Sequence, residues 1–205
     1  MGKLIKEIRK PFLITITLMV LCGFIYPLML TVISQVLFPR QAGGSLIFVH
    51  EKAVGSELIG QDFTEKRFMK GRPSAVGYNT YTKEQLNGGE YFGIRSGSEN
   101  YGPSNPELKK RVSKDMEQFL ELNPSVKKEE IPGDLMAASG SGLDPHISPE
   151  AAAIQIPGLA KATGLTQERL KEIVEQNTQE KFLGIFGEKR VHVLKVNLQI
   201  AEDLE

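Results

Sequence analysis

The residues best suited to chemistry lie in one stretch, Asp134–Gln155, which reads DLMAASGSGLDPHISPEAAAIQ. Two serines, Ser139 and Ser141, are followed by Asp144 and His146. A serine, a histidine and an aspartate together can hydrolyse acyl bonds when the histidine accepts the serine proton. Such residues usually converge from separated parts of a chain, whereas these lie close together and lack a Gly-x-Ser-x-Gly elbow. The spacing therefore argues against a hydrolase.

The glycines of this loop, Gly140 and Gly142, suggest a second interpretation, a loop that cradles phosphate. The Gly-Lys-Ser/Thr ending of a Walker loop is absent, however. The three histidines, His50, His146 and His192, also lack the spacing of metal ligands. We favour a third interpretation, in which the loop is rigid and shaped for structure or for docking.

Cap and turn residues predict the elements that hold this loop. Asp144-Pro145 predicts a turn, and Ser148 followed by proline and glutamate predicts a helix start. Pro157 should break that helix, and Gly164 should end a second piece. Thr166 should cap a third helix, whose inward residues are Leu170, Ile173 and Val174.

Further elements follow from local patterns. Leu46–Val49 reads as a short strand, and Asn105-Pro106 opens a helix with one apolar face. Val191–Ile200 alternates between apolar and mixed positions, which predicts a strand with one buried side. His192 shares its apolar face, so we expect a hydrogen-bonded core histidine.

Residues 71–102 are rich in glycine, asparagine and tyrosine, and should be irregular. A loop of this length in a compact domain is unusual unless it is an interaction surface. We expect either a partner face, which would include Arg72, or a surface loop fixed by its own turns.

One uncharged stretch, Pro11–Pro39, lies between Lys10 and Arg40. As a helix it would reach about 43 Å, which exceeds the roughly 30 Å hydrocarbon core of a bilayer. It is too long for a signal peptide, which needs only about 7–15 apolar residues and a small-x-small cleavage site. We therefore expect a retained transmembrane helix, with a local kink near Gly23 and Pro27.

The charges beside this helix predict its orientation. Basic residues crowd its N-terminal side (Lys3, Lys6, Arg9 and Lys10), so the positive-inside rule places residues 1–10 in the cytoplasm as a basic tail. Residues 11–39 would be the transmembrane helix, and residues 40–205 an extracytoplasmic domain. We expect that domain to have an α/β (α+β) fold.

Composition limits the partners of this domain. The basic tail holds four of the 25 basic residues and one of the 25 acidic residues, which leaves 21 basic residues against 24 acidic ones. Nucleic acid is therefore not expected as a partner, because phosphate binding needs clustered positive charge. The one cysteine, Cys22, lies in the apolar stretch, so a disulfide or cysteine-based metal site is excluded outside it.

Several blocks in order resemble the C subunit of the bacterial Kdp-type potassium-transporting ATPase. They are GSELIGQ, GRPSA, the block at Ser96–Pro106, SGSGLDPHISP, Gln155 and RVHVLKVNL. The likeness covers nearly the whole chain. Three places depart from the family pattern: Gly158-Leu159-Ala160 replaces Arg-Val-Ala, Thr163 replaces an arginine, and His192 replaces an asparagine.

The resemblance implies an accessory subunit of the bacterial cell membrane that stabilises a potassium uptake complex and acts as a catalytic chaperone. Its implied partners are a channel-like potassium-translocating subunit, a catalytic P-type ATPase subunit, a small single-helix subunit and the lipid bilayer. ATP binding is implied by the family, and potassium is the ion that the complex transports. The candidate interface or functional residues are Ser139, Gly140, Ser141, Gly142, Asp144, His146, Gln155, Arg72 and Asn105. The alternative is an anchored extracytoplasmic hydrolase or ligand-binding domain.

Overall fold

The computed structural model describes residues 2–89 and 93–205, and the chain divides into two compact units, Met1–Val54 and Gly55–Glu205. Three positions of the expected irregular segment, 90–92, lie outside the described residues. The helices are α1 (Gly2–Val20), α2 (Tyr26–Leu37), α3 (Pro39–Ala42), α4 (Lys83–Asn87), α5 (Pro106–Leu122), α6 (Pro149–Ala153), α7 (Ile156–Thr163), α8 (Gln167–Gln176) and α9 (Val193–Glu202). The strands are β1 (Leu46–Val49), β2 (Lys52–Ser56), β3 (His146–Ile147), β4 (Thr178–Gln179) and β5 (Arg190–His192). A π-helical turn, η1 (Leu21–Ile25), and the 3-10 helices η2 (Gly77–Asn79), η3 (Lys128–Glu130) and η4 (Gly133–Leu135) complete the set.

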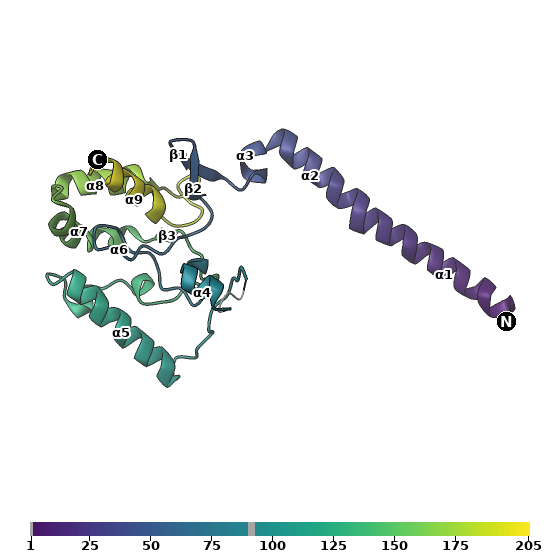
Figure 1. The fold of residues 1–205 in the computed structure, drawn as a ribbon, viewed down its shortest axis with the longest axis horizontal. Helices are drawn as coiled ribbons and strands as arrows, with labels where there is room; N and C mark the ends of the chain where they lie inside the picture. The colour runs from purple at the N-terminus through teal and green to yellow at the C-terminus, as the bar shows by residue number, and fades with distance from the viewer. Residues whose placement is uncertain (1, 90–92) are drawn as a thin grey trace. The chain divides into compact units, whose positions relative to one another are not determined.

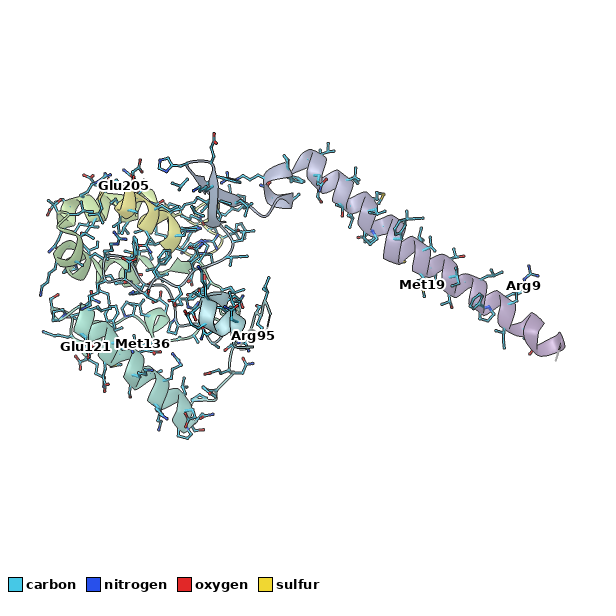
Figure 2. The ribbon with its side chains drawn as sticks, in the orientation of Figure 1. Arg9, Met19, Arg95, Glu121, Met136 and Glu205 are labelled. Atoms are coloured by element: carbon cyan, nitrogen blue, oxygen red, sulfur yellow. The ribbon has the colours of Figure 1, made fainter. Side chains whose placement is uncertain are left out.

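The first unit consists mainly of one long helix, formed by α1, η1 and α2 in succession (Figure 1). Its segment Glu7–Leu37 has 31 residues and is long and apolar enough to cross a membrane. None of this segment is buried within the structure, and Met19, for example, projects outwards with 62% of its surface exposed (Figure 2). The hydroxyls of Thr15 and Thr31 donate to carbonyls four residues back in the same helix. These two threonines therefore satisfy their own hydrogen bonds, as a lipid environment requires.

A local kink is expected near Gly23 and Pro27, and the structure has a π-helical turn at this place. Proline has no N–H to donate to the carbonyl of Gly23, four residues earlier. The turn η1 covers this region, and the N–H of Tyr26 bonds the carbonyl of Leu21, five residues back. A single wide turn of this kind is a common way for a helix to absorb a break in its hydrogen-bond ladder.

The predicted strand Leu46–Val49 is confirmed as β1, which pairs with β2 in a two-stranded sheet. His50 and Glu51 connect the strands and have positive φ angles of 47° and 64°. The boundary between the two units falls within β2.

The second unit is built around a small antiparallel sheet in the order β3-β5-β4. His146 of β3 lies opposite His192 of β5, and Val191 of β5 lies opposite Thr178 of β4. Figure 1 shows α6 to α9 grouped together, with α5 along another side of the unit. The core comprises Met69, Phe119, Leu135, Ile147, Ala151, Ala152, Ile156, Leu159, Leu170, Ile173, Val174, Val191, Val193, Val196 and Ile200.

The helices predicted from caps are confirmed. The Asn105 side chain accepts the N–H of Glu107 at the start of α5, and Ser148 caps α6 by accepting the N–H of Ala151. Pro157 separates α6 from α7 because it lies in the first turn of α7. Gly164 ends α7 in the left-handed conformation, and Thr166 caps α8.

The predicted strand Val191–Ile200 is wrong beyond its first two residues. Strand β5 ends at His192, and Val193–Glu202 forms the helix α9. Residues Val193, Leu194, Val196, Asn197 and Ile200 are buried, at the one-, three- and four-residue intervals of a helix face. The sequence fits both periods because short apolar runs with a few polar residues do not distinguish helix from strand.

Candidate functional site

The glycine-rich loop Ser139–Pro145 is held by backbone hydrogen bonds to segments far apart in the sequence. Its residues bond the backbone of Gly60, Pro73, Gly97 and Val193, at nitrogen–oxygen distances of 2.8–3.2 Å. Ser96 adds a hydroxyl bond to the carbonyl of Ser141, at 3.1 Å. The expectation of a rigid loop is therefore consistent with its contacts, since each backbone bond ties it to a separate part of the second unit.

Two glycines permit the close approach of these segments. A Cβ atom added to Gly60 would lie 2.5 Å from the carbonyl oxygen of Asp144 and 2.6 Å from a ring carbon of Tyr78. Gly142 has a φ of +68°, and its Cβ would lie 2.7 Å from Val76. Both positions therefore require glycine, one for space and the other for space and conformation.

Asp144 is the centre of the polar contacts at the end of the loop. Its Oδ2 accepts a bond from Nη1 of Arg72 at 3.0 Å, and its Oδ1 accepts the N–H of His146 at 3.0 Å. Nδ1 of His146 lies 3.6 Å from the same Oδ1. Burial acts to raise the pKa of Asp144, but the bonds from His146 and Arg72 outweigh it and hold the pKa below its ordinary value. Asp144 is therefore a carboxylate that joins Arg72 to the loop.

Arg72 is itself fixed from two sides. Its Nη2 donates to the carbonyl of Ala137 at 3.3 Å, and its own carbonyl accepts the hydroxyl of Tyr78 at 2.6 Å. Burial and the nearby Asp144 raise the pKa of Tyr78 to about 12, so its hydroxyl stays protonated and donating. The neighbouring Ser74 hydroxyl donates to the carbonyl of Gly142 at 2.6 Å. The structure therefore brings Arg72 together with the loop.

The serines do not meet the histidine. Ser139 is 2% exposed, and its hydroxyl has no hydrogen-bond partner among residues 2–89 and 93–205. The Ser141 hydroxyl accepts the N–H of Leu143, and Nε2 of His146 is buried with no partner in the same described ranges. The bond between nucleophile and base that a hydrolase needs is thus not made here.

Gln155 has a structural place away from Asp144. Its side-chain oxygen accepts the N–H of Lys70 at 2.8 Å, and its nitrogen donates to the carbonyls of Lys70 and Ala151. Asn197 makes the same pair of bonds to the N–H and carbonyl of Met69. These two buried side-chain amides bond backbone groups of Met69 and Lys70 in the way that a neighbouring strand would. They therefore hold the segment that leads to Arg72. Asn105 serves as the cap of α5.

Sequence reasoning missed Asn197, Tyr78, Ser74 and Asp134. The carboxylate of Asp134 accepts both the N–H and the hydroxyl of Ser148, and so fixes the start of α6. A buried asparagine within an apolar run is a signal that could have identified Asn197, because such a side chain needs a partner. Tyr78 and Asp134 lie in the short 3-10 helices η2 and η4, and Ser74 lies in a loop, where no periodic pattern predicts a partner.

Two cavities flank Arg72. One, of about 280 Å³, is lined by residues that include Lys70, Tyr78, Phe119 and Met136, and Figure 2 labels Met136 near α5. The other, of about 490 Å³, is lined by Arg72, Asp134, Asp144, His146, Ile147, Ser148, Glu188, Lys189 and Arg190. This mixture of acids and bases does not select one charge of ligand.

Within the described part of the chain, no group of three or more His, Cys, Asp or Glu residues could hold a metal ion.

His192 is a buried, hydrogen-bonded histidine, as expected. It is fully buried, its Nε2 lies 3.1 Å from the carbonyl oxygen of Glu57, and its Nδ1 accepts the N–H of Lys195 at 3.4 Å. Its ring packs edge-on against His146, with centroids 5.2 Å apart. Burial lowers the pKa of His192 and outweighs the hydrogen bond to Glu57, which acts to raise it, and the nearby His146 and Lys195 lower it further.

Acidification should therefore weaken the second unit through His192. Below about pH 6.5 the unfolded chain takes up a proton that the folded His192 resists, so the free energy of unfolding falls as the pH falls. The variant His192→Asn should show a smaller loss between about pH 7 and pH 5. Thermal unfolding of the full chain in detergent, followed by the near-ultraviolet signal of its tyrosines, measures this. The exposed His50→Asn is the control, and an unchanged pH profile for His192→Asn would contradict the assignment.

Comparison with known proteins gives one family match and relatives that all carry the name of that family. Residues 8–202 match the family model described as KdpC: K+-transporting ATPase, c chain. The chain is 62% identical over 204 residues to the potassium-transporting ATPase KdpC subunit of Clostridium kluyveri, covering 100% of this chain and 97% of the relative. It is 55% identical to the KdpC subunit of Clostridioides difficile, covering 97% and 98%, and 47% identical to that of Caldanaerobacter subterraneus, covering 98% and 97%.

Proposed function

Because this chain belongs to the KdpC family and is an accessory subunit of the Kdp potassium-transporting ATPase complex, we propose that it stabilises the assembled complex and promotes ATP use by the catalytic subunit. Other Kdp subunits are its partners. The proposed partners are a channel-like potassium-translocating subunit, a catalytic P-type ATPase subunit and a small single-helix subunit. The observation that carries the proposal is the match over residues 8–202, which includes the apolar stretch 11–39 and the loop Ser139–Pro145.

The proposed topology is a single pass through the bacterial cell membrane by residues 11–39, with residues 1–10 in the cytoplasm and residues 40–205 outside. The length of the apolar helix supports the pass, since 31 residues rise about 46 Å in a helix. The basic residues before it support the orientation. Arg40 and Lys52 are the nearest basic residues after it, so the charge bias is clear.

The second unit is proposed to dock on the channel-like subunit near the potassium entrance. The loop Ser139–Pro145 is tied to four other segments and to Arg72 through Asp144, so it offers a surface of fixed shape. Surfaces that are ordered before binding lose less conformational entropy when they dock. The slight acidic excess of residues 11–205 favours a cation nearby, although salt screens this effect beyond about 8–10 Å.

Promotion of ATP use is proposed to be indirect. A domain outside the membrane cannot touch cytosolic ATP, so its effect on nucleotide affinity would be a coupling between distant sites of the complex. The alternative, an anchored hydrolase or ligand-binding domain, predicts activity or ligand binding by the second unit without other subunits.

Cysteine labelling tests the topology. Cys22 is the only cysteine, so a Cys22→Ser chain is a clean background for Glu7→Cys and Glu205→Cys. A membrane-impermeant maleimide is added to protoplasts. It should label the Glu205→Cys chain at once and the Glu7→Cys chain only after lysis. The reverse pattern would place the second unit in the cytoplasm and refute the proposal.

A further inference from the structure

The loop between β4 and β5 carries four large apolar side chains that face solvent. Phe182, Leu183, Ile185 and Phe186 are 71%, 74%, 76% and 62% exposed. With Gly184 they form a continuous five-residue segment, Phe182–Phe186, which we call the apolar tip. Single exposed apolar residues are ordinary on protein surfaces, but four in five positions indicate a contact with something apolar.

Hydrogen bonds hold the apolar tip in a defined shape. The backbones of Phe182 and Phe186 exchange two bonds, Phe182 N–H to Phe186 O at 2.8 Å and Phe186 N–H to Phe182 O at 2.9 Å. The N–H of Ile185 also bonds the carbonyl of Phe182, at 3.2 Å. The side chains are therefore presented by a closed turn, and the turn leaves them exposed.

Leu183 adds an independent observation. Its φ is +53°, in the left-handed region where asparagine or glycine is favoured and leucine is strained. Gly184, with a φ of +73°, fills the next position of the turn in the usual way. A leucine at a strained and exposed turn position contributes little to folding, so such an outlier points to a function for its side chain.

We propose that the apolar tip inserts into the lipid interface of the membrane that the N-terminal helix spans. Phenylalanine, leucine and isoleucine are the residues that interfacial segments bury at the boundary between headgroups and acyl chains. The base of the tip is charged: Glu180 and Lys189 form an ion pair at 2.7 Å, and Lys181, Glu188 and Arg190 lie beside it. Apolar residues at the end and charged residues at the base match the change from acyl chain to headgroup.

Size favours lipid over a protein partner for this segment. A specific protein–protein interface uses about 20–30 residues on each side, whereas the apolar tip has five and is flanked by charged residues. Lipid insertion needs no shape complementarity, so a small tip suffices.

The chain tethers the second unit, which carries the apolar tip, to the apolar helix. The apolar helix ends at Leu37 and the second unit begins at Gly55. Even if fully extended, the 17 residues between them reach no more than about 60 Å. This tether raises the effective concentration of the tip at the membrane surface, so that weak insertion is enough. The inference thus rests on the proposed anchoring of Glu7–Leu37.

A tryptophan reporter tests the inference directly, because the chain contains no tryptophan. The full-length Phe182→Trp chain is reconstituted into vesicles of phosphatidylcholine and phosphatidylglycerol, with or without brominated acyl chains. The emission of Phe182→Trp in vesicles with brominated acyl chains should be about half of its emission in vesicles without them. Quenching of this size is expected because interfacial segments lie about 5–10 Å deep in the bilayer. The control is Leu86→Trp in α4, a leucine that is 49% exposed, and its emission should be unaffected.

A second variant isolates the tip. Adding Leu183→Asp to the Phe182→Trp chain should remove the quenching, and the fold should persist because Leu183 is exposed. If the chain floats with the vesicles and the emission of Phe182→Trp is not quenched, the inference is overturned. This holds whether the emission lies at long wavelength, as for tryptophan in water, or at short wavelength, as for tryptophan covered by protein. Failure to float would instead refute the anchoring, and the inference with it.

Discussion

Deleting residues 11–39 should release the chain from the membrane and abolish its recovery with the other Kdp subunits. The deleted segment contains most of the 31-residue apolar helix, and none of that helix is buried. Each Leu, Ile, Phe or Val at the centre of a span favours insertion by about 0.3–0.6 kcal/mol, so the loss over the segment is several kcal/mol. Membrane fractionation and purification through a C-terminal tag measure both effects.

A foreign span of equal length is the matched control for this deletion. Thr15 and Thr31 bond carbonyls of their own helix, so these polar groups do not require a neighbouring subunit. An artificial leucine-rich helix should therefore restore membrane attachment and assembly. Normal assembly of the deleted chain would contradict the anchoring, whereas attachment without assembly in the foreign-span chain would show that the helix also makes specific contacts.

The substitution Gly60→Ala should strongly destabilise the second unit and detach the loop Ser139–Pro145. The new Cβ would lie 2.5 Å from the carbonyl oxygen of Asp144, a backbone atom that cannot rotate away. Relief of the clash would stretch the bond from the N–H of Gly60 to the carbonyl of Leu143, now 2.8 Å. Overpacking of this kind costs about 1–3 kcal/mol or more, and we expect the upper end because backbone must move.

Thermal unfolding of the purified full-length native and Gly60→Ala proteins measures this loss of stability. Pull-down of the other subunits measures its effect on assembly. The matched control is Gly133→Ala, because a Cβ at that glycine would meet no atom within 4 Å from elsewhere in the described part of the chain, its own local backbone aside. The control should be close to the native protein in both assays. Equal unfolding temperatures for Gly60→Ala and the native chain would show that the close approach of the loop is not needed.

Local signals in the sequence predicted many elements well. Caps and helix ends such as Asn105, Ser148 and Gly164 were predictable because each depends on a few adjacent residues. The apolar helix was predictable because its length and lack of charge leave few alternatives. The strand expected over Val191–Ile200 failed beyond His192 because burial of both Val193 and Leu194 suits a helix face, which alternation alone does not reveal.

The assembly of the candidate site depends on contacts between distant residues and could not be predicted in detail. The bond from Arg72 to Asp144 joins residues 72 positions apart, and the bonds from Asn197 to Met69 join residues 128 apart. Gly158 is a similar case: a Cβ there would lie 2.3 Å from Oδ1 of Asn123 and 2.9 Å from the carbonyl oxygen of Leu122. Its glycine therefore fits the close approach of α7 to the end of α5.

Purification of the tagged full-length chain from its own membranes in mild detergent tests the central claim most directly. The account predicts that a large multi-span subunit and a P-type ATPase subunit accompany the chain, and that the preparation hydrolyses ATP faster when potassium is added. A chain that is recovered alone, without potassium-stimulated ATPase activity, would contradict the account.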